Sequence, residues 1–247
     1  MNETIRLMQN HRSIRKFTGQ PVTDEQLDAI IEAAQHASTS SNMQAFSVIG
    51  VTDPVLKEQL AELAGGQAYV AECPIFLVWC ADLYRFERAA GRHLKEEQKE
   101  QTSTTENFII STVDATLAAQ NAALAAESLG LGIVYIGGIR NQPKRVSELL
   151  GLPEKVYPVF GMCIGVPDQE PLSRPRLPKE AVFHRNMYQI ERTDQAIDEY
   201  DATISAYMRE RSDGKTDATW SQAMAAKTAQ KRLHMREFLK DQGFRLE

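Results

Sequence analysis

One long, unbroken helical stretch constrains the fold of this sequence more than any other feature. Residues 106–129 contain neither glycine nor proline and are rich in alanine and leucine, which favour helix. A helix of 24 residues is about 36 Å long, enough to cross a domain. Ile109, Val113, Leu117 and Leu124 are expected to give it a broad apolar face. The sequence therefore predicts a buried central helix, whose alanines let neighbouring elements approach closely.

A buried strand and a glycine pair follow the predicted helix. Gly130 is suited to end the helix in the left-handed conformation. Residues 131–136 are apolar and bounded by glycines, which predicts a buried strand. Gly137 and Gly138 come directly after it, and a backbone without a Cβ can approach a ligand closely. We expect the rest of the chain to pack around the helix, and a binding site to form at the glycine pair.

Composition narrows the class of protein. The chain has 247 residues, 43% of them hydrophobic and 25% charged, which fits one large soluble domain. Its formal net charge of −5 argues against binding to a nucleic-acid backbone. The N-terminus lacks a signal-peptide core, and no apolar run reaches the roughly 18 residues of a membrane span. Cys73, Cys80 and Cys163 lack metal-binding spacing, which predicts buried thiols in a reducing, cytoplasmic protein.

Apolar periodicity and turn signals predict the remaining elements. Strands are expected at 45–51, 74–80 and 156–165. Helices are expected near residues 5–8, from a Thr23–Gln26 capping box to Ala34, at 54–64, from an Asn141 cap, and at about 196–210, 219–228 and 230–241. A charged, partly helical excursion covers 84–105, and a helical extension covers about 190–247. Four buried strands separated by helices predict a single layered sheet-and-helix domain over 1–247.

Several familiar site motifs are absent from the sequence. Gly130-Leu-Gly132 follows a helix instead of a strand and lacks a third glycine, so it is not a dinucleotide fingerprint. The sequence has no phosphate-binding P-loop and no GxSxG nucleophile motif. Its five histidines are scattered along the chain. We therefore predict no metal site and no catalytic triad.

Three polar clusters remain at the ends of predicted elements. Residues 11–15 combine two guanidiniums, an imidazole and a hydroxyl, which suit a phosphate ester; a charged loop between helices is the alternative. Residues 39–44 carry hydroxyls and amides, which form either a helix terminator or a binding loop. Arg174 and Arg176 flank a proline on an extended backbone, where a solvated turn is the alternative interpretation.

Taken together, these segments resemble the flavin-dependent nitroreductase family, in its branch of NADPH-dependent oxygen-insensitive nitroreductases and NADPH:FMN oxidoreductases. The matching stretches are HRSIRKFT (11–18), STSSNMQ (38–44), LAGGQ (63–67), AAQNAALAAESLGLGIVYIGGIRN (118–141), RPRLP (174–178) and RERSDGKTDATW (209–220). They cover nearly the whole chain in order and spacing. The resemblance implies an α+β fold with a mixed central sheet between helical layers. It also implies an intertwined homodimer with flavin at the subunit interface.

The resemblance further assigns residues to an FMN cofactor and to NADPH. The phosphate of FMN would be bound by His11, Ser13, Arg174 and Arg176, with Arg12 beside the ribityl chain and Arg15 near N1 and O2 of the ring. The polar edge of the ring or the ribityl path would be lined by Thr39, Ser40, Ser41, Gln44 and Gln67. The ring would be passed closely by Tyr135, Ile136, Gly137 and Gly138, with the Gly137 N–H at N5; packing is the alternative role for Tyr135. The phosphate of NADPH would be reached by Arg211 and Lys215, for which a solvated helix end is the alternative.

The implied activity is that of an FMN-containing oxidoreductase that uses NADPH to reduce nitro compounds, quinones or flavins. Hydride would pass from NADPH to the flavin and then to an acceptor at the same face, which gives ping-pong kinetics. Arg15 would stabilise the negative charge that reduction leaves on the ring, and no side-chain base is required. Two alternatives stay open: a dedicated NAD(P)H:flavin reductase and a non-catalytic flavin-binding sensor, since a fold does not fix a function.

Overall fold

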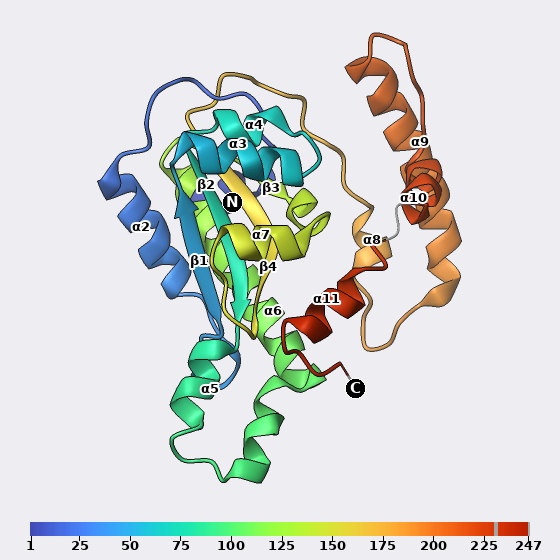
Figure 1. Cartoon of the computed structure of the whole chain (residues 1–247). Helices are drawn as coiled ribbons and strands as arrows, with labels where there is room; N and C mark the ends of the chain where they lie inside the picture. The colour runs from blue at the N-terminus through green and yellow to red at the C-terminus, as the bar shows by residue number, and fades with distance from the viewer. Residues whose placement is uncertain (230–231, 247) are drawn as a thin grey trace. The chain divides into compact units, whose positions relative to one another are not determined.

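The computed structural model describes residues 1–229 and 232–246, which form two compact units (Figure 1). The first unit spans Met1–Pro171 and Arg232–Glu247, and the second spans Leu172–Lys231. The single domain expected from the sequence stays a prediction.

The first unit contains all the strands that the structure describes. Its helices and strands are, in chain order, α1 (Glu3–Gln9), α2 (Asp24–Gln35), η1 (Ser40–Asn42), β1 (Phe46–Val51), α3 (Pro54–Leu63), α4 (Ala68–Glu72), β2 (Ile75–Asp82), α5 (Tyr84–Ala90), η2 (Glu96–Ser103), α6 (Thr105–Ser128), β3 (Gly132–Ile136), η3 (Gly137–Arg140), α7 (Pro143–Leu149), β4 (Val156–Gly165) and α11 (Met235–Asp241). The four predicted strands are therefore confirmed. Residues 84–105 contain α5 and η2, and their role as an excursion from the domain stays a prediction.

The strands form one sheet in the order β1-β2-β4-β3. All three strand pairs are antiparallel. One parallel bridge, between Ser13 and Ile133, lies outside the named strands, so the predicted mixed character is limited to this bridge. The β2–β4 register shifts between Trp79 and Cys80, which leaves Val159 as the extra residue of a β-bulge.

Helices cover both faces of the sheet (Figure 1). Side chains of β2 alternate between the two layers, as the two-residue period of a strand requires. Leu77 and Trp79 pack in one apolar cluster with α2 and α6. Phe76 and Val78 pack in another with α3, α4 and α7. The α+β class with a sheet between helical layers is thereby confirmed.

The long helix α6 is present as predicted, but it buries a different face. Its buried residues include Ala115, Ala118, Ala119, Ala122, Ala123 and Ala126. Ile109, Val113 and Leu117 are instead 50%, 48% and 43% exposed. The prediction that these larger side chains lie in the core is wrong for the single chain, because small alanines allow the closest approach to the sheet and α2.

By length and composition alone, α6 is also apolar enough to cross a membrane. The core helix of a soluble protein meets the same two criteria, and α6 packs its alanine face against the sheet.

Side-chain caps begin two of the helices, α2 and α3. Thr23 begins α2 with a capping box, and Asp53 caps α3 through the N–H of Leu56. The predicted Asn141 cap is wrong, because α7 begins after Gln142. The Asn141 amide instead donates to the backbone carbonyl of residue 64 at 3.3 Å.

The second unit is helical throughout its regular structure. It contains α8 (Lys179–Val182), η4 (Ile190–Arg192), α9 (Thr193–Arg211) and α10 (Trp220–Thr228). The Tyr200 hydroxyl donates to the Pro175 carbonyl at 2.9 Å, which ties α9 to the extended segment of this unit. The helices predicted at 196–210 and 219–228 are confirmed. The one predicted at 230–241 appears as α11, and its expected start at 230 and 231 lies outside the described residues.

Candidate functional site

The first polar cluster, residues 11–15, lies along the edge strand β3. The Ile14 N–H donates to the Ile133 carbonyl, and the Thr18 N–H donates to the Val166 carbonyl, both at 2.9 Å. The Ile14 side chain fills the space above Gly132, where an added Cβ would lie 2.6 Å from Cγ1 of Ile14. The segment is thus held against the sheet by both backbone and side chain.

The polar side chains of this segment differ in their partners. Nδ1 of His11 lies 2.6 Å from Oε1 of Glu127 on α6. The Arg12 guanidinium donates through Nη1 to the Asn10 carbonyl at 3.0 Å. Its Nε is buried and has no hydrogen-bond partner within the described part of the chain. A buried donor without a partner is costly, which marks this nitrogen as a group awaiting an acceptor.

Arg15, three residues further along the same segment, is exposed. Its backbone N–H donates to Oε1 of Gln169 at 3.3 Å, and its Nη1 lies 3.5 Å from the Ser13 carbonyl. The charged end of Arg15 is therefore open to solvent, so that it is available to an anionic ligand.

Two residues predicted at the site, Gln67 and Gly138, meet at the end of β3. The Gln67 amide donates to the Ala64 carbonyl at 2.8 Å and accepts from the Tyr69 hydroxyl at 2.5 Å. A Cβ added at Gly138 would lie 2.2 Å from the Ala64 carbonyl oxygen and 2.5 Å from Nε2 of Gln67. Only glycine fits there. At Gly137 the nearest atom to an added Cβ is 3.5 Å away, so this side of the turn is open.

The side chains of Tyr135 and Ile136 point to opposite faces of the sheet. The Tyr135 ring packs edge-on against Phe160 with centroids 5.2 Å apart. Burial, helped by the charge of Glu127, raises the pKa of Tyr135 above its ordinary range. Ile136 is buried in the α3–α7 layer. Both side chains serve packing, so these two positions offer a ligand their backbone.

The second cluster forms a strained loop before β1. Ser41, Asn42 and Gln44 have φ angles of 48°, 57° and 50°. These lie in the left-handed region, which residues with a Cβ rarely adopt. The Thr39 hydroxyl accepts from the Gln44 N–H at 3.3 Å, which closes the loop on itself. Such strain persists only where surrounding contacts enforce it, and it occurs often at functional sites.

A hollow of about 790 Å³ lies beside this loop. Ile31 of α2, Phe46 of β1 and Phe86 of α5 give it apolar walls, while Gln44 and Arg85 give it polar ones. Its size and mixed lining are those of a small-molecule site.

Within one chain the two clusters are kept apart. Residues 11–15, Gln67 and Gly138 belong to the β3 edge of the sheet, whereas the 39–44 loop leads into β1 at the opposite edge. Three strand spacings separate the two edges, or about 14 Å. That all these residues line one flavin stays a prediction.

The remaining predicted residues lie in the second unit. Arg174 and Arg176 are exposed, and Nη1 of Arg176 donates to the Arg174 carbonyl at 3.2 Å. Arg211 ends α9, and Arg211 and Lys215 are exposed. Arg211 makes no ion pair with any residue that the structure describes.

Four charged side chains that contact these segments or Asn141 belong to none of the polar clusters predicted from the sequence. They are Glu127 at His11, Asp114 and Arg85 at the 39–45 loop, and Arg232, whose Nε donates to Oδ1 of Asn141 at 3.0 Å. Each is a single charge in an otherwise ordinary stretch, so no local pattern could have revealed it.

Arg140, at the end of η3, is half-buried. Its guanidinium donates to the carbonyl of Val159 in the β-bulge. Burial, followed by the nearby charge of Arg232, lowers the pKa of Arg140 below its ordinary range. Within the described ranges, no group of three or more His, Cys, Asp or Glu residues could hold a metal ion.

Comparison with known proteins finds similarity along nearly the whole chain. Residues 8–166 match the sequence model of the nitroreductase family, and residues 174–247 match that of the nitroreductase family, C-terminal domain. An FMN reductase (NADPH) of Bacillus subtilis is 47% identical over 99% of each chain. An oxygen-insensitive NADPH nitroreductase of Salmonella typhimurium is 45% identical over 90% of this chain and 89% of its own. The solved structure of NfrA1 from B. megaterium superposes with a TM-score of 0.95 at 45% identity, over 98% of this chain and 99% of that one.

Proposed function

This chain belongs to the nitroreductase family, and on that basis we propose that it is an NADPH-dependent flavin oxidoreductase with FMN as its cofactor. The names of its relatives support both the nucleotide and the flavin. The observation in the structure that carries the proposal is the buried, unpartnered Nε of Arg12 within a cationic segment.

The residues present fit a flavin mononucleotide. The 11–15 segment offers cations and a hydroxyl to a phosphate ester, and charge-assisted contacts of this kind are the strong ones. The close packing of Gly138 on Gln67 leaves bare backbone at the end of β3, and the open side of Gly137 gives a flat ring room to approach. Arg174 and Arg176 would add two more cations to the phosphate.

When bound, FMN supplies the atom that accepts hydride and gives it up again. The chain would orient the cofactor and stabilise charge. Arg15, which is exposed, would place a cation at the pyrimidine edge of the ring. The Gly137 N–H would donate to the ring on its N5 side, and Thr39, Ser40, Ser41 and Gln44 would supply hydroxyls and an amide. NADPH and the acceptor would use the same face in turn, which gives ping-pong kinetics.

The functional unit that we propose is an intertwined homodimer. The two segments that we assign to the flavin lie at opposite edges of one sheet, and a second copy would bring its 39–44 loop to the 11–15 segment. Ile109, Val113 and Leu117 form an exposed apolar row on α6 at helical spacing, which suits burial against another copy. In the second unit, Met187 and Ile190 are exposed as well.

The nucleotide would be recognised by the second unit. Arg211 and Lys215 place two exposed cations around the turn after α9. A guanidinium can meet the 2′-phosphate of NADPH with paired hydrogen bonds. We place the enzyme in the cytoplasm because its three cysteines are all free and buried, as in proteins of reducing compartments.

The main rival is a dedicated flavin reductase, for which free FMN is a substrate. The names of several relatives favour it, whereas another relative is a nitroreductase. A non-catalytic flavin sensor is the other rival. Nitroaromatics, quinones and free flavin tested as acceptors at equal concentration separate the first two functions.

The decisive experiment measures bound flavin and its reduction. Purified wild type is expected to be yellow, with about one FMN per chain on the assignment above, and NADPH should bleach it anaerobically within seconds. Arg12→Met should lose FMN, whereas Arg6→Met, at another arginine of the same N-terminal region, should retain it. Colourless protein that does not take up added FMN overturns the proposal, and a yellow protein that NADPH does not bleach is a sensor.

A further inference from the structure

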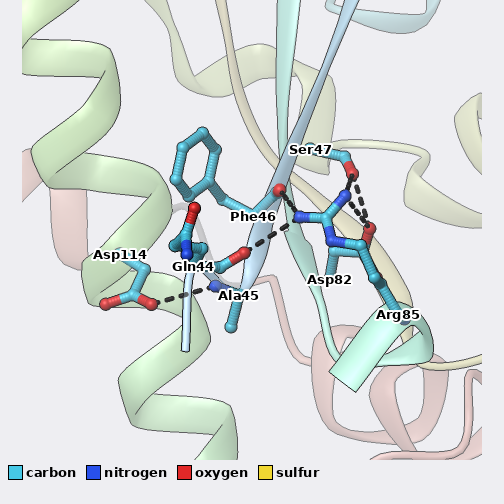
Figure 2. Close-up of polar contacts among 7 residues, drawn as sticks. All are labelled: Gln44, Ala45, Phe46, Ser47, Asp82, Arg85 and Asp114. Atoms are coloured by element: carbon cyan, nitrogen blue, oxygen red, sulfur yellow. Dashed lines mark hydrogen bonds and ion pairs between the residues drawn. The ribbon is translucent and has the colours of Figure 1, made fainter. Parts of the chain in front are cut away.

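The 39–45 loop is held by two charged side chains from helices far away in the sequence. One is Asp114 in the middle of α6, and the other is Arg85 in the first turn of α5 (Figure 2). Neither belongs to the motifs that carry the family resemblance. Both contact the loop or the residue that follows it.

Asp114 binds the two ends of the loop through backbone N–H groups. Its Oδ1 accepts from Ser40 at 3.2 Å, and its Oδ2 accepts from Ala45 at 3.0 Å. The residue is only 1% exposed and makes no ion pair within the described part of the chain. Burying a carboxylate without hydrogen-bond partners costs free energy, and so does burying an unpaired N–H group. The Asp114 carboxylate and the two N–H groups therefore satisfy one another.

Arg85 binds the carbonyl side of the same backbone. Its Nη2 donates to the Gln44 carbonyl at 2.9 Å and to the Phe46 carbonyl at 2.6 Å. Its Nη1 donates to the Ser47 hydroxyl at 3.3 Å. Asp82 orients this arginine, since Oδ1 accepts from its backbone N–H at 3.0 Å and Oδ2 lies 3.6 Å from Nη1 (Figure 2).

The two contacts are complementary in charge and in the groups that they use. Asp114 accepts from backbone N–H groups, and Arg85 donates to backbone carbonyls. The loop contributes only backbone atoms to both contacts. None of the loop's own side chains takes part in these two contacts; within the loop, the Thr39 hydroxyl accepts from the Gln44 N–H and the Gln44 amide contacts Asn42. We call Asp114 and Arg85 together the clamp. Its contacts explain how Ser41, Asn42 and Gln44 stay in left-handed conformations, which a free loop would not keep.

We infer that Asp114 and Arg85 are positioning residues that hold the 39–45 loop in its flavin-binding conformation. The inference rests on the proposed function, because it assumes that this loop contacts FMN. A ligand that binds one loop conformation loses apparent affinity in proportion to the fraction of protein in that conformation. Removing either charge should therefore weaken FMN binding, although neither side chain need touch the cofactor.

The test compares four variants with wild type. Asp114→Asn keeps the shape of the side chain, but its NH₂ would face one of the two N–H donors. Arg85→Met keeps length and removes all donors. The matched controls are Glu106→Gln on α6 and Arg88→Met on α5, which remove an exposed charge from the same helices. FMN dissociation constants are measured by fluorescence quenching, and amide hydrogen exchange is followed across residues 39–46.

Both clamp variants should raise the FMN dissociation constant at least about tenfold, as the loss of one charge-assisted contact predicts. Amide exchange in residues 40–45 should accelerate in both, and the controls should match wild type. Should Asp114→Asn fail to fold, Arg85→Met decides alone.

The failures are distinguishable. Wild type that does not bind FMN overturns the proposed function. The inference itself is overturned by a different result: wild type binds FMN, and a folded Asp114→Asn or Arg85→Met variant has a lower urea midpoint but an unchanged FMN affinity. Asp114 and Arg85 would then have a purely structural role.

Discussion

Nδ1 of His11 and Oε1 of Glu127 lie 2.6 Å apart, although the two residues are 116 positions apart in the chain. The carboxylate fixes the orientation of an imidazole that we assign to the FMN phosphate. Glu127→Gln should therefore weaken FMN binding by about 1 kcal/mol, or roughly fivefold, the typical value of one hydrogen bond. Equilibrium titration of the apoprotein with FMN measures this. Glu62→Gln on the surface of α3 is the control, and equal affinities in all three proteins would contradict the assignment.

Gly138 has no room for a side chain. An added Cβ would lie 2.2 Å from the Ala64 carbonyl oxygen, a backbone atom that cannot swing away. Gly138→Ala should lower the free energy of unfolding by about 1–3 kcal/mol, as overpacking does. Gly19→Ala is the matched control, because nothing lies within 4 Å of a Cβ placed there. Urea titration compares the two, and an unchanged midpoint for Gly138→Ala would refute the close packing.

The exposed apolar row of α6 should be the dimer contact. Val113→Lys places a charge in that row, and burying an unpaired ammonium costs several kcal/mol. The variant should be a monomer by light scattering and should retain little FMN, since one copy separates the two flavin clusters. Val55→Lys on α3 is the control, because Val55 is 62% exposed in another part of the unit. If Val113→Lys is still a dimer that binds flavin, the proposal that this row forms the dimer contact is wrong.

Arg211 should act on NADPH alone. Arg211→Ala should raise the KM for NADPH by about ten- to a hundredfold, the equivalent of about 1.5–3 kcal/mol for a charge-assisted contact. FMN content and the oxidation of pre-reduced enzyme by an acceptor should stay unchanged, because the second half-reaction does not involve the nucleotide. Arg209→Ala is the control, because the Arg209 side chain is already paired with Asp217 at 3.3 Å. An equal KM in Arg211→Ala and wild type would make Arg211 a surface charge.

Stability should fall in alkaline solution because of the buried thiol of Cys80. Burial, followed by the charge of Asp82, raises the pKa of Cys80 from 9.0 to about 12. The folded state holds this proton more tightly than the unfolded state, so the stabilisation is complete below pH 9.0 and is lost as the pH rises toward about 12. In that window Cys80→Ala should lose less stability, by about 1.4 kcal/mol per pH unit. Urea unfolding at several pH values measures the slopes, which should be equal below pH 8.

Local signals in the sequence predicted the elements well. The Thr23–Gln26 capping box and the helix-favouring run that became α6 involve near neighbours in the chain, so their structure can be inferred from composition and spacing. The face that α6 buries could not be inferred, because alanine and valine are both apolar. Close approach to the sheet decided it in favour of the smaller side chain.

The candidate site was harder to predict than the fold. Segments 11–15 and 39–44 were identified by their residue types, but their positions at opposite edges follow from strand order, which local patterns do not encode. The side chains that hold them, such as Asp114 and Arg85, come from elsewhere in the chain and carry no motif.

All three cysteines are free and buried. A thiol-reactive dye added to the folded protein should therefore find no native target, and a cysteine introduced on the surface would be the sole labelled position. Asn42→Cys would place such a reporter on the strained loop beside the hollow, where its fluorescence could follow ligand arrival in real time. Native burial of the thiols thus makes the chain a ready scaffold for site-specific optical labelling.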